Sequence, residues 1–135
     1  MHKIVMDTNV FISSKLKPQG NPAEIMKLIS AGKIELYFTP RILDEFEATL
    51  SKPKFKLSVE EQREFVEIIK EVGILIDDPM PGGSEIIEIN DPDDRIFYDA
   101  ARASDAVLVS GDKHLLELDK PFIMKPAEYL DYISL

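Results

Sequence analysis

The sequence predicts an α/β fold with a central parallel sheet that is covered by helices on both faces. Apolar runs of strand length alternate along the chain with helical stretches that carry an apolar stripe, an alternation typical of parallel sheets. The first run, at residues 3–6, is predicted to be a buried strand, and it ends abruptly at the acidic residue Asp7. Because open α/β folds bind their ligands at the carboxyl ends of strands, this position indicates a functional edge.

The next two elements are a helix and a strand. Asn21 is predicted to cap the helix, with Pro22 at its first helical position and Gly32 at its end. The run IELYF at residues 34–38 is predicted to be the second strand.

Two helices are predicted to follow before the third strand. The first begins after a Thr-Pro pair and carries its apolar stripe from Ile42 to Leu50. The second begins at a capping box formed by Ser58 and Glu61 and ends at Gly73. The third strand is predicted at residues 74–76. The remaining predicted elements are a loop over 78–83, a helix from 91–93 through 103, a strand at 106–110, a short helix within 111–118, a strand at 121–124 and a final helix from Pro126.

Length and composition indicate one ordinary globular domain. The chain has 135 residues, and we expect a single domain over residues 1–135. It has no cysteine, which excludes disulfides and thiolate metal sites. The first strand begins without a leader pattern, and no apolar run is long enough to span a bilayer, so we expect a cytoplasmic protein without membrane contact.

The chain is strongly acidic. Its formal net charge is −9, which taken alone argues against nucleic acid, because phosphate binding depends on Lys and Arg. A clustered acidic site would account for part of this imbalance, and a bound Mg²⁺ or Mn²⁺ would cancel charge there. The acidic balance also suits a basic protein partner.

Asp7 and Glu45 are the first two candidate site residues. Asp7 ends the first strand, and a cap for a following helix is an equally good interpretation of its position. Glu45 lies on the margin of the apolar face of its helix, whereas Asp44 should face solvent. Periodicity does not choose between Glu45 and Glu47, and either could be a solvated helix residue.

Asp94 and Asp112 are the other two candidates. Asp94 shares a helix face with Phe97 and Ala101, on the packed side, while Asp99 should be exposed. The small residues at 100, 101 and 103 should let this helix approach the sheet. Asp112 follows the strand at 106–110 through a tight turn, and a cap for the next short helix is again an alternative.

The four acids together are more than helix capping requires. Carboxylates without cysteine or histidine partners suit Mg²⁺ or Mn²⁺. Such an ion can hold a phosphodiester oxygen and lower the pKa of a bound water. His114 is the only histidine nearby, and we expect it to be a surface residue rather than a general base.

These residues resemble the PIN-domain family of metal-dependent ribonucleases. The matching stretches are VMDTNVFIS, ILDEFEATL, DPDDRIFYDAA and VSGDKHLLEL, which contain the four acids in order and span most of the chain. The resemblance is greatest to VapC-like toxin components of toxin–antitoxin pairs, where a late KPAEYL-like helix recurs.

The resemblance implies a three-layer α/β/α fold and an acidic pocket that binds Mg²⁺ or Mn²⁺ for RNA cleavage. It implies that the metal-binding, catalytic acids are Asp7, Glu45, Asp94 and Asp112, with Glu45 selected over Glu47. It implies orienting roles for Asn9 and Ser110, and leaves Asp91 and Asp93 open as outer acids. It also implies a small antitoxin partner, and homodimers are common in the family.

Basic side chains should border the pocket if RNA is the substrate. One candidate pair is Lys15 and Lys17, shortly after the first strand. The other group, Lys52, Lys54 and Lys56, surrounds Phe55, an arrangement that suits single-stranded RNA. A solvated loop with Phe55 packed into the core is an equally good interpretation.

Two other functions fit parts of the pattern. A receiver or phosphatase-type phosphotransfer domain also gathers acids at strand ends, but no acid ends the IELYF strand. A non-catalytic RNA- or protein-binding module would keep the metal for structure only, although stability alone seldom requires so many convergent acids.

Overall fold

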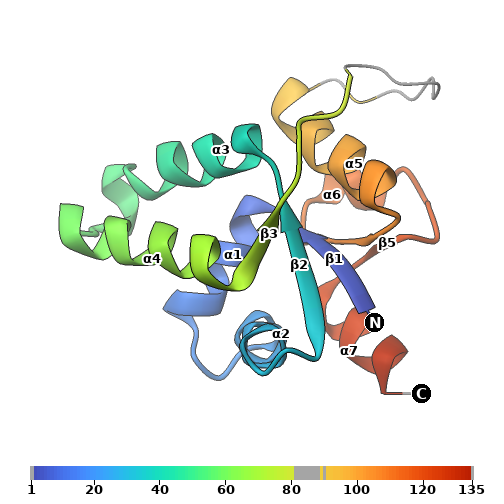
Figure 1. Ribbon diagram of the computed structural model, residues 1–135, viewed down its shortest axis with the longest axis horizontal. Coiled ribbons are helices and arrows are strands. Elements are labelled where there is room, and N and C mark those ends of the chain that lie inside the picture. Colours follow the sequence, from blue (N-terminus) through green and yellow to red (C-terminus); the bar gives the residue numbers. More distant parts are fainter. Residues whose placement is uncertain (1, 81–88, 90, 135) are drawn as a thin grey trace.

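Five parallel strands form the sheet that positions every candidate site residue. The computed structural model describes residues 2–80, 89 and 91–134. The strands lie in the order β3-β2-β1-β4-β5, with β1 in the centre (Figure 1), which confirms the predicted parallel sheet. Their bounds are β1 His2–Met6, β2 Ile34–Phe38, β3 Gly73–Leu75, β4 Val107–Val109 and β5 Ile123–Met124.

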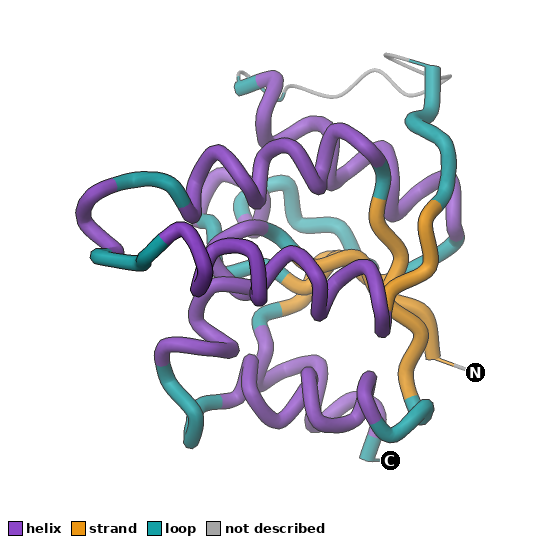
Figure 2. The backbone as a smooth tube through the Cα atoms, turned by 60° about the vertical axis from the view of Figure 1, so that its left-hand side comes forward, coloured by secondary structure: helices purple, strands orange, loops and turns teal. Residues whose placement is uncertain are grey.

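Helices cover both faces of this sheet, as Figure 2 shows, so the three-layer α/β/α prediction is confirmed. Helix α5 packs on β1, β2 and β4, while α2 packs on β2 and contacts α7. Crossovers between parallel strands are right-handed as a rule. The connections that lead toward β3 and those that lead toward β5 run in opposite directions along the sheet, so this rule predicts that their helices lie on opposite faces. The helices are α1 Thr8–Leu16, α2 Asn21–Ser30, α3 Pro40–Leu50, α4 Val59–Val72, α5 Pro92–Ser104, α6 Lys113–Leu116 and α7 Pro126–Ile133. No helix in the described part of the chain is long and apolar enough to cross a membrane.

Two of the predicted helix starts have the expected capping bonds. The Thr39 hydroxyl oxygen accepts a hydrogen bond from the backbone N–H of Ile42 at 3.2 Å, at the start of α3. The Ser58 hydroxyl accepts from Glu61 N–H at 3.0 Å, and the Glu61 carboxylate accepts from Ser58 N–H at 2.9 Å. Both starts are therefore determined by local side-chain chemistry.

Helix α1 is the element that sequence periodicity missed. Its residues Thr8, Val10, Phe11, Ile12 and Ser14 are all buried. A helix that is buried on most sides has no polar face, and so it shows no amphipathic stripe in the sequence.

Smaller differences lie at element ends. Asn21 is the first residue of α2 and Gly20 occupies the cap position, without a side-chain capping bond. Gly73 begins β3, so this strand lies one residue earlier than predicted.

The loop after helix α3 contains a short 3₁₀ helix, Pro53–Phe55. Ala103 is exposed, so only Ala100 and Ala101 provide the close approach of α5. Residues 81–83 of the predicted loop lie outside the described residues.

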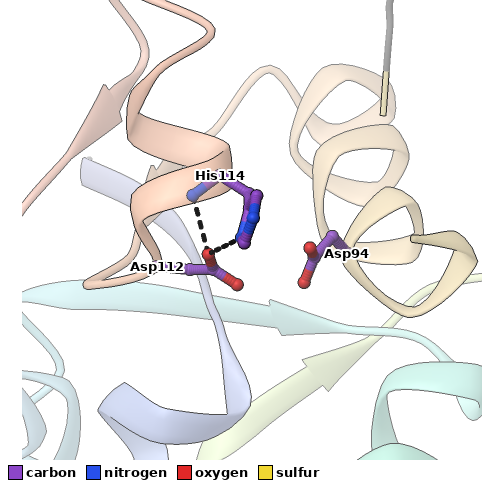
Figure 3. Close-up of side chains that lie close together, drawn as sticks. All are labelled: Asp94, Asp112 and His114. Atoms are coloured by element: carbon purple, nitrogen blue, oxygen red, sulfur yellow. Dashed lines mark hydrogen bonds and ion pairs between the residues drawn. The ribbon is translucent and has the colours of Figure 1, made fainter. Parts of the chain in front are cut away.

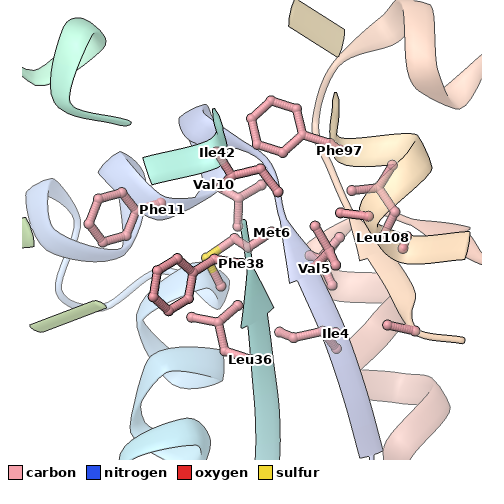
Figure 4. Packing of buried hydrophobic residues seen from close by; sticks show 14 of the residues in the cluster. Ile4, Val5, Met6, Val10, Phe11, Leu36, Phe38, Ile42, Phe97 and Leu108 are labelled. Atoms are coloured by element: carbon pink, nitrogen blue, oxygen red, sulfur yellow. The ribbon is translucent and has the colours of Figure 1, made fainter. Parts of the chain in front are cut away.

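The core around β1 and β2 (Figure 4) continues into a row of aromatic rings that joins four helices. The Phe11 ring stacks on Phe46 with centroids 4.5 Å apart and meets the edge of Phe65 at 5.7 Å. Phe46 in turn lies 6.3 Å from Phe97. This contact between the two rings fixes α3 and α5 beside each other. Glu45 directly precedes Phe46, and Asp94 lies three residues before Phe97, so the same packing helps to position both acids.

Replacing Gly73 with alanine should destabilise the protein by about 1–3 kcal/mol, because overpacking a closed site forces backbone or side-chain shifts. A Cβ at this position would lie 2.7 Å from the Ile69 carbonyl oxygen and 2.8 Å from the Phe38 ring. Urea unfolding would measure the effect. Gly111→Ala is the matched control, because nothing lies within 4 Å of a Cβ there. Equal stability of the two variants would contradict the prediction.

Candidate functional site

The register of β1 and β4 places Asp7 beside Ser110. Met6 is paired with Val109, so the next residue of each strand projects from the same carboxyl edge. The Ser110 hydroxyl donates a hydrogen bond to Asp7 Oδ2, and the Val10 N–H donates to Asp7 Oδ1 at 2.9 Å. Asp7 is only 4% exposed. It therefore caps α1 and also lies at the sheet edge, so its two interpretations are compatible.

Of the two candidate glutamates on α3, Glu45 lies at this edge of the sheet and Glu47 does not. Glu45 is half-buried on α3, and the Thr49 hydroxyl one turn later donates to its Oε1 at 3.3 Å. Glu47 is exposed on the same helix. Rotation of α3 about its axis, fixed by the burial of Phe46, makes the choice that periodicity left open.

Asp94 and Asp112 face each other from two different helix starts (Figure 3). Asp94 lies in the first turn of α5, which Asp91 caps by accepting from Asp93 N–H at 2.9 Å. Asp112 caps α6 by accepting from His114 N–H at 2.8 Å, so the capping interpretation of Asp112 also holds.

His114 is a surface residue near these acids, as the sequence predicted, and its imidazole lies beside one of them. Its Nδ1 is 3.3 Å from Asp112 Oδ1, and its side chain is 81% exposed. One ligand atom from each of Asp94, Asp112 and His114 can be chosen so that all three lie within 4.8 Å of one another. Its two-residue spacing from Asp112 indicated this nearness, but the sequence did not predict that the imidazole could share an ion with the two carboxylates.

A cleft at the carboxyl edge of the sheet, here called the acidic cleft, brings most of the predicted residues together. Its volume is about 270 Å³. Its lining includes all four candidate metal ligands together with Asn9, Asp91, Asp93, Lys52 and Lys54, and it adds Thr8, Thr49 and Phe97, which sequence reasoning had not assigned to the site.

The other predicted basic pair lies elsewhere. Lys15 lines a separate cavity beside α2 and α4, and its Nζ lies 5.9 Å from the Phe65 ring centroid. Lys17 is an exposed residue at the end of α1 and does not line the acidic cleft. Phe55 is half-buried and packs against the core, in agreement with the alternative interpretation of that loop.

Asp99 differs from its prediction. It was expected to be exposed, but its side chain is only 19% exposed and its Oδ2 lies 3.3 Å from Nε of Arg95. The i,i+4 spacing of the two residues on α5 explains this ion pair, which lies outside the lining of the acidic cleft.

The acidic cleft carries more negative charge than its surroundings compensate. Burial raises the pKa of Asp7, although the hydrogen bond from Ser110 partly opposes this. Burial and the nearby Asp93 raise the pKa of Glu45. Burial and the neighbouring Asp112 raise the pKa of Asp94 to about 7. A divalent cation would relieve all three effects, and the donor set of hard carboxylate oxygens fits Mg²⁺ or Mn²⁺.

The metal-free protein should lose stability as the pH rises from about 4 to about 7, because folded Asp94 binds its proton more tightly than the unfolded chain does. The stabilising protonation is complete below the unfolded pKa and is lost through the folded pKa. Urea unfolding in EDTA at about pH 5 and about pH 8 would measure it. Asp94→Asn should flatten this dependence, and an equally steep profile in that variant would contradict the assignment.

Comparisons with known proteins agree with this geometry. The sequence model of the PIN domain family matches residues 3–114. The chain is 33% identical over 119 residues to the uncharacterized protein MJ1680 of Methanocaldococcus jannaschii, covering 86% of this chain and 74% of that protein.

Two solved structures share the fold. One is the crystal structure of VapBC2 from Rickettsia felis bound to a DNA fragment from their promoter, with a TM-score of 0.62, 18% identity, and 91% of this chain and 96% of that chain covered. The other is FitAB bound to the IR36 DNA fragment, with a TM-score of 0.56, 16% identity, and 91% and 94% covered.

Proposed function

Because this chain belongs to the PIN domain family, we propose that it is a metal-dependent endoribonuclease and the toxin of a toxin–antitoxin pair. The observation that carries the proposal is the convergence of Asp7, Glu45, Asp94 and Asp112 on one cleft. Asp7 follows β1, Glu45 and Asp94 lie in α3 and α5, and Asp112 precedes α6. Because the four acids come from different elements, helix capping alone does not explain why they lie in one cleft.

Each acid has a distinct task in the proposed site. Asp7 is held rigidly by Ser110 and Val10, so it provides a fixed ligand position. The Thr49 hydroxyl donates to Glu45, and Asp94 and Asp112 face each other from α5 and from the start of α6. When bound, Mg²⁺ or Mn²⁺ would supply an activated water and charge compensation for the phosphodiester. Asn9, exposed in the cleft lining, is positioned to contact a bound substrate.

Lys52 and Lys54 are the residues that we propose contact RNA phosphates, since both are exposed and both line the acidic cleft. Replacing both with alanine should raise KM for single-stranded RNA with little change in kcat. The slope of log affinity against log salt should fall by about 0.7 for each lost phosphate contact. Fluorescence anisotropy at several salt concentrations would measure this.

The matched control for that variant is Lys15→Ala combined with Lys17→Ala. It removes the same charge from a surface outside the acidic cleft. An equal loss of RNA affinity in both double variants would show that overall charge, and not these positions, governs binding.

A small antitoxin is the proposed protein partner. The fold is shared with chains in the VapBC2 and FitAB structures, and the net charge of −9 suits a basic inhibitor segment. Co-expression with the product of an adjacent gene should give a complex that no longer cleaves RNA. We also expect a homodimer, which light scattering would test.

If RNA is the substrate, we expect the activity in the cytoplasm.

The decisive experiment is cleavage of a labelled single-stranded RNA by the purified protein with Mn²⁺ or with EDTA. Cutting that requires Mn²⁺ and yields discrete internal fragments would support the proposal. RNA binding without cutting would instead favour a non-catalytic binding module. Cutting that persists in EDTA would contradict the role of the metal.

A further inference from the structure

One histidine, expected from the sequence only as a nearby surface residue, lies beside two of the candidate carboxylates. The side chain of His114 stands beside Asp112 and on the side of Asp94 (Figure 3). Its Nδ1 is 3.3 Å from Asp112 Oδ1. The imidazole is 81% exposed, and the Asp112 carboxylate is the polar group beside it.

The three side chains are close enough to share one ion. Their selected ligand atoms lie within 4.8 Å of one another. Metal–ligand bonds of about 2.1 Å place the ligand atoms of one ion within about 4.2 Å of each other. A bound ion would need to draw these atoms only slightly closer together.

We propose that His114 is a direct ligand of the ion held by Asp94 and Asp112, and that it makes this site prefer Mn²⁺ to Mg²⁺. The inference rests on the proposed function, because it concerns an ion bound at the edge of the acidic cleft. Mg²⁺ selects oxygen ligands, whereas imidazole nitrogen favours first-row transition ions. A nitrogen ligand therefore changes the preference between two ions that the four carboxylates alone would both accept.

The position of His114 also separates it from the other acids. It lines a neighbouring cavity of about 520 Å³ that it shares with Asp91 and Asp94, whereas Asp7, Glu45 and Asp112 line only the acidic cleft. Asp91 and Asp94 thus line both spaces. An ion bound by Asp94, Asp112 and His114 would therefore lie where the two spaces meet.

Electron spin echo modulation of the Mn²⁺-loaded protein tests the proposal directly, because a bound imidazole couples its ¹⁴N nucleus to the Mn²⁺ electrons. The wild-type protein should show this coupling and His114→Ala should lose it. The chain has only two histidines, so His2→Ala is a complete control. His2 lies in β1, at the opposite end of the sheet, and its variant should keep the coupling.

Affinity measurements separate ligation from a merely structural role. His114→Ala should weaken Mn²⁺ binding by about 10-fold or more, by analogy with the loss of residues that support a metal ligand. Mg²⁺ affinity should change by less than about 2-fold, since the ion prefers oxygen. If His114 only orients Asp112, both affinities should fall together, and that result would overturn the proposal.

Two further outcomes distinguish this inference from the proposed function. Mn²⁺ binding that requires Asp94 but shows no ¹⁴N coupling would overturn the role of His114 and leave the nuclease proposal standing. A protein that binds no Mn²⁺ at all would overturn both.

Discussion

Asp94→Asn should reduce Mn²⁺-dependent cleavage of single-stranded RNA by at least about 100-fold, a loss expected when a residue central to a metal site is removed. Asp94 faces Asp112 directly and lines both the acidic cleft and the cavity that contains His114. Asparagine has nearly the same shape but lacks the charge. The variant should therefore fold normally and bind Mn²⁺ weakly. Initial rates and calorimetric titration would measure the two effects.

The control for this variant is Asp105→Asn, purified identically. Asp105 ends α5 in a left-handed conformation at φ 53°, which asparagine tolerates, and it lies outside the acidic cleft. It should cleave RNA like the wild-type protein. If Asp94→Asn and Asp105→Asn cut RNA equally, the cutting comes from a contaminant or from another site.

Asp7→Asn should make the metal-free protein more stable at neutral pH while it abolishes cleavage. The Asp7 carboxylate is 4% exposed, and burial raises its pKa. Asparagine keeps an oxygen that can accept the hydrogen bond from Val10 N–H, and it removes the buried charge, but its amide nitrogen cannot accept the bond that the Ser110 hydroxyl donates to Oδ2. We expect the removal of the charge to outweigh the loss of this one bond. We expect a gain of about 1 kcal/mol in the free energy of unfolding, the scale of the desolvation penalty of a buried polar group.

The stability difference between Asp7→Asn and the wild-type protein should depend on pH. Burial raises the pKa of folded Asp7 above its ordinary value, so the stability contributed by its protonation is complete below that ordinary value and is lost as the pH rises through the folded pKa. The advantage of the asparagine variant should therefore be absent at low pH and grow toward neutrality. Urea unfolding in EDTA would measure it.

Mn²⁺ should reverse the order of the two proteins. It stabilises the folded wild-type protein by binding to it, whereas Asp7→Asn lacks one ligand and gains less. A metal-free variant that is less stable than the wild-type protein at neutral pH would show that Asp7 is a structural residue whose charge is already compensated.

The element order could be predicted because its signals are local. The capping box at Ser58 and Glu61 formed as expected, and α3 begins at the predicted Thr39-Pro40 pair. The parallel arrangement followed from the alternation of strands and helices. Helix α1 was missed because it is buried on most sides and leaves no periodic stripe. The resemblance to the PIN family added the four acids in order, and the sequence model of that family matches residues 3–114.

The sequence by itself determined which strand ends and helix starts carry acids, because residue type and element boundaries are properties of short segments. Only the tertiary structure decided which side chains meet. The packing of Phe46 and Phe97 turns Glu45 inward and leaves Glu47 outside. The path of the chain brings Lys52 and Lys54 to the acidic cleft but not Lys15, and it sets His114 beside Asp94 across 20 residues of sequence. These choices depend on strand register and helix rotation, which contacts between distant segments set and which no local pattern encodes.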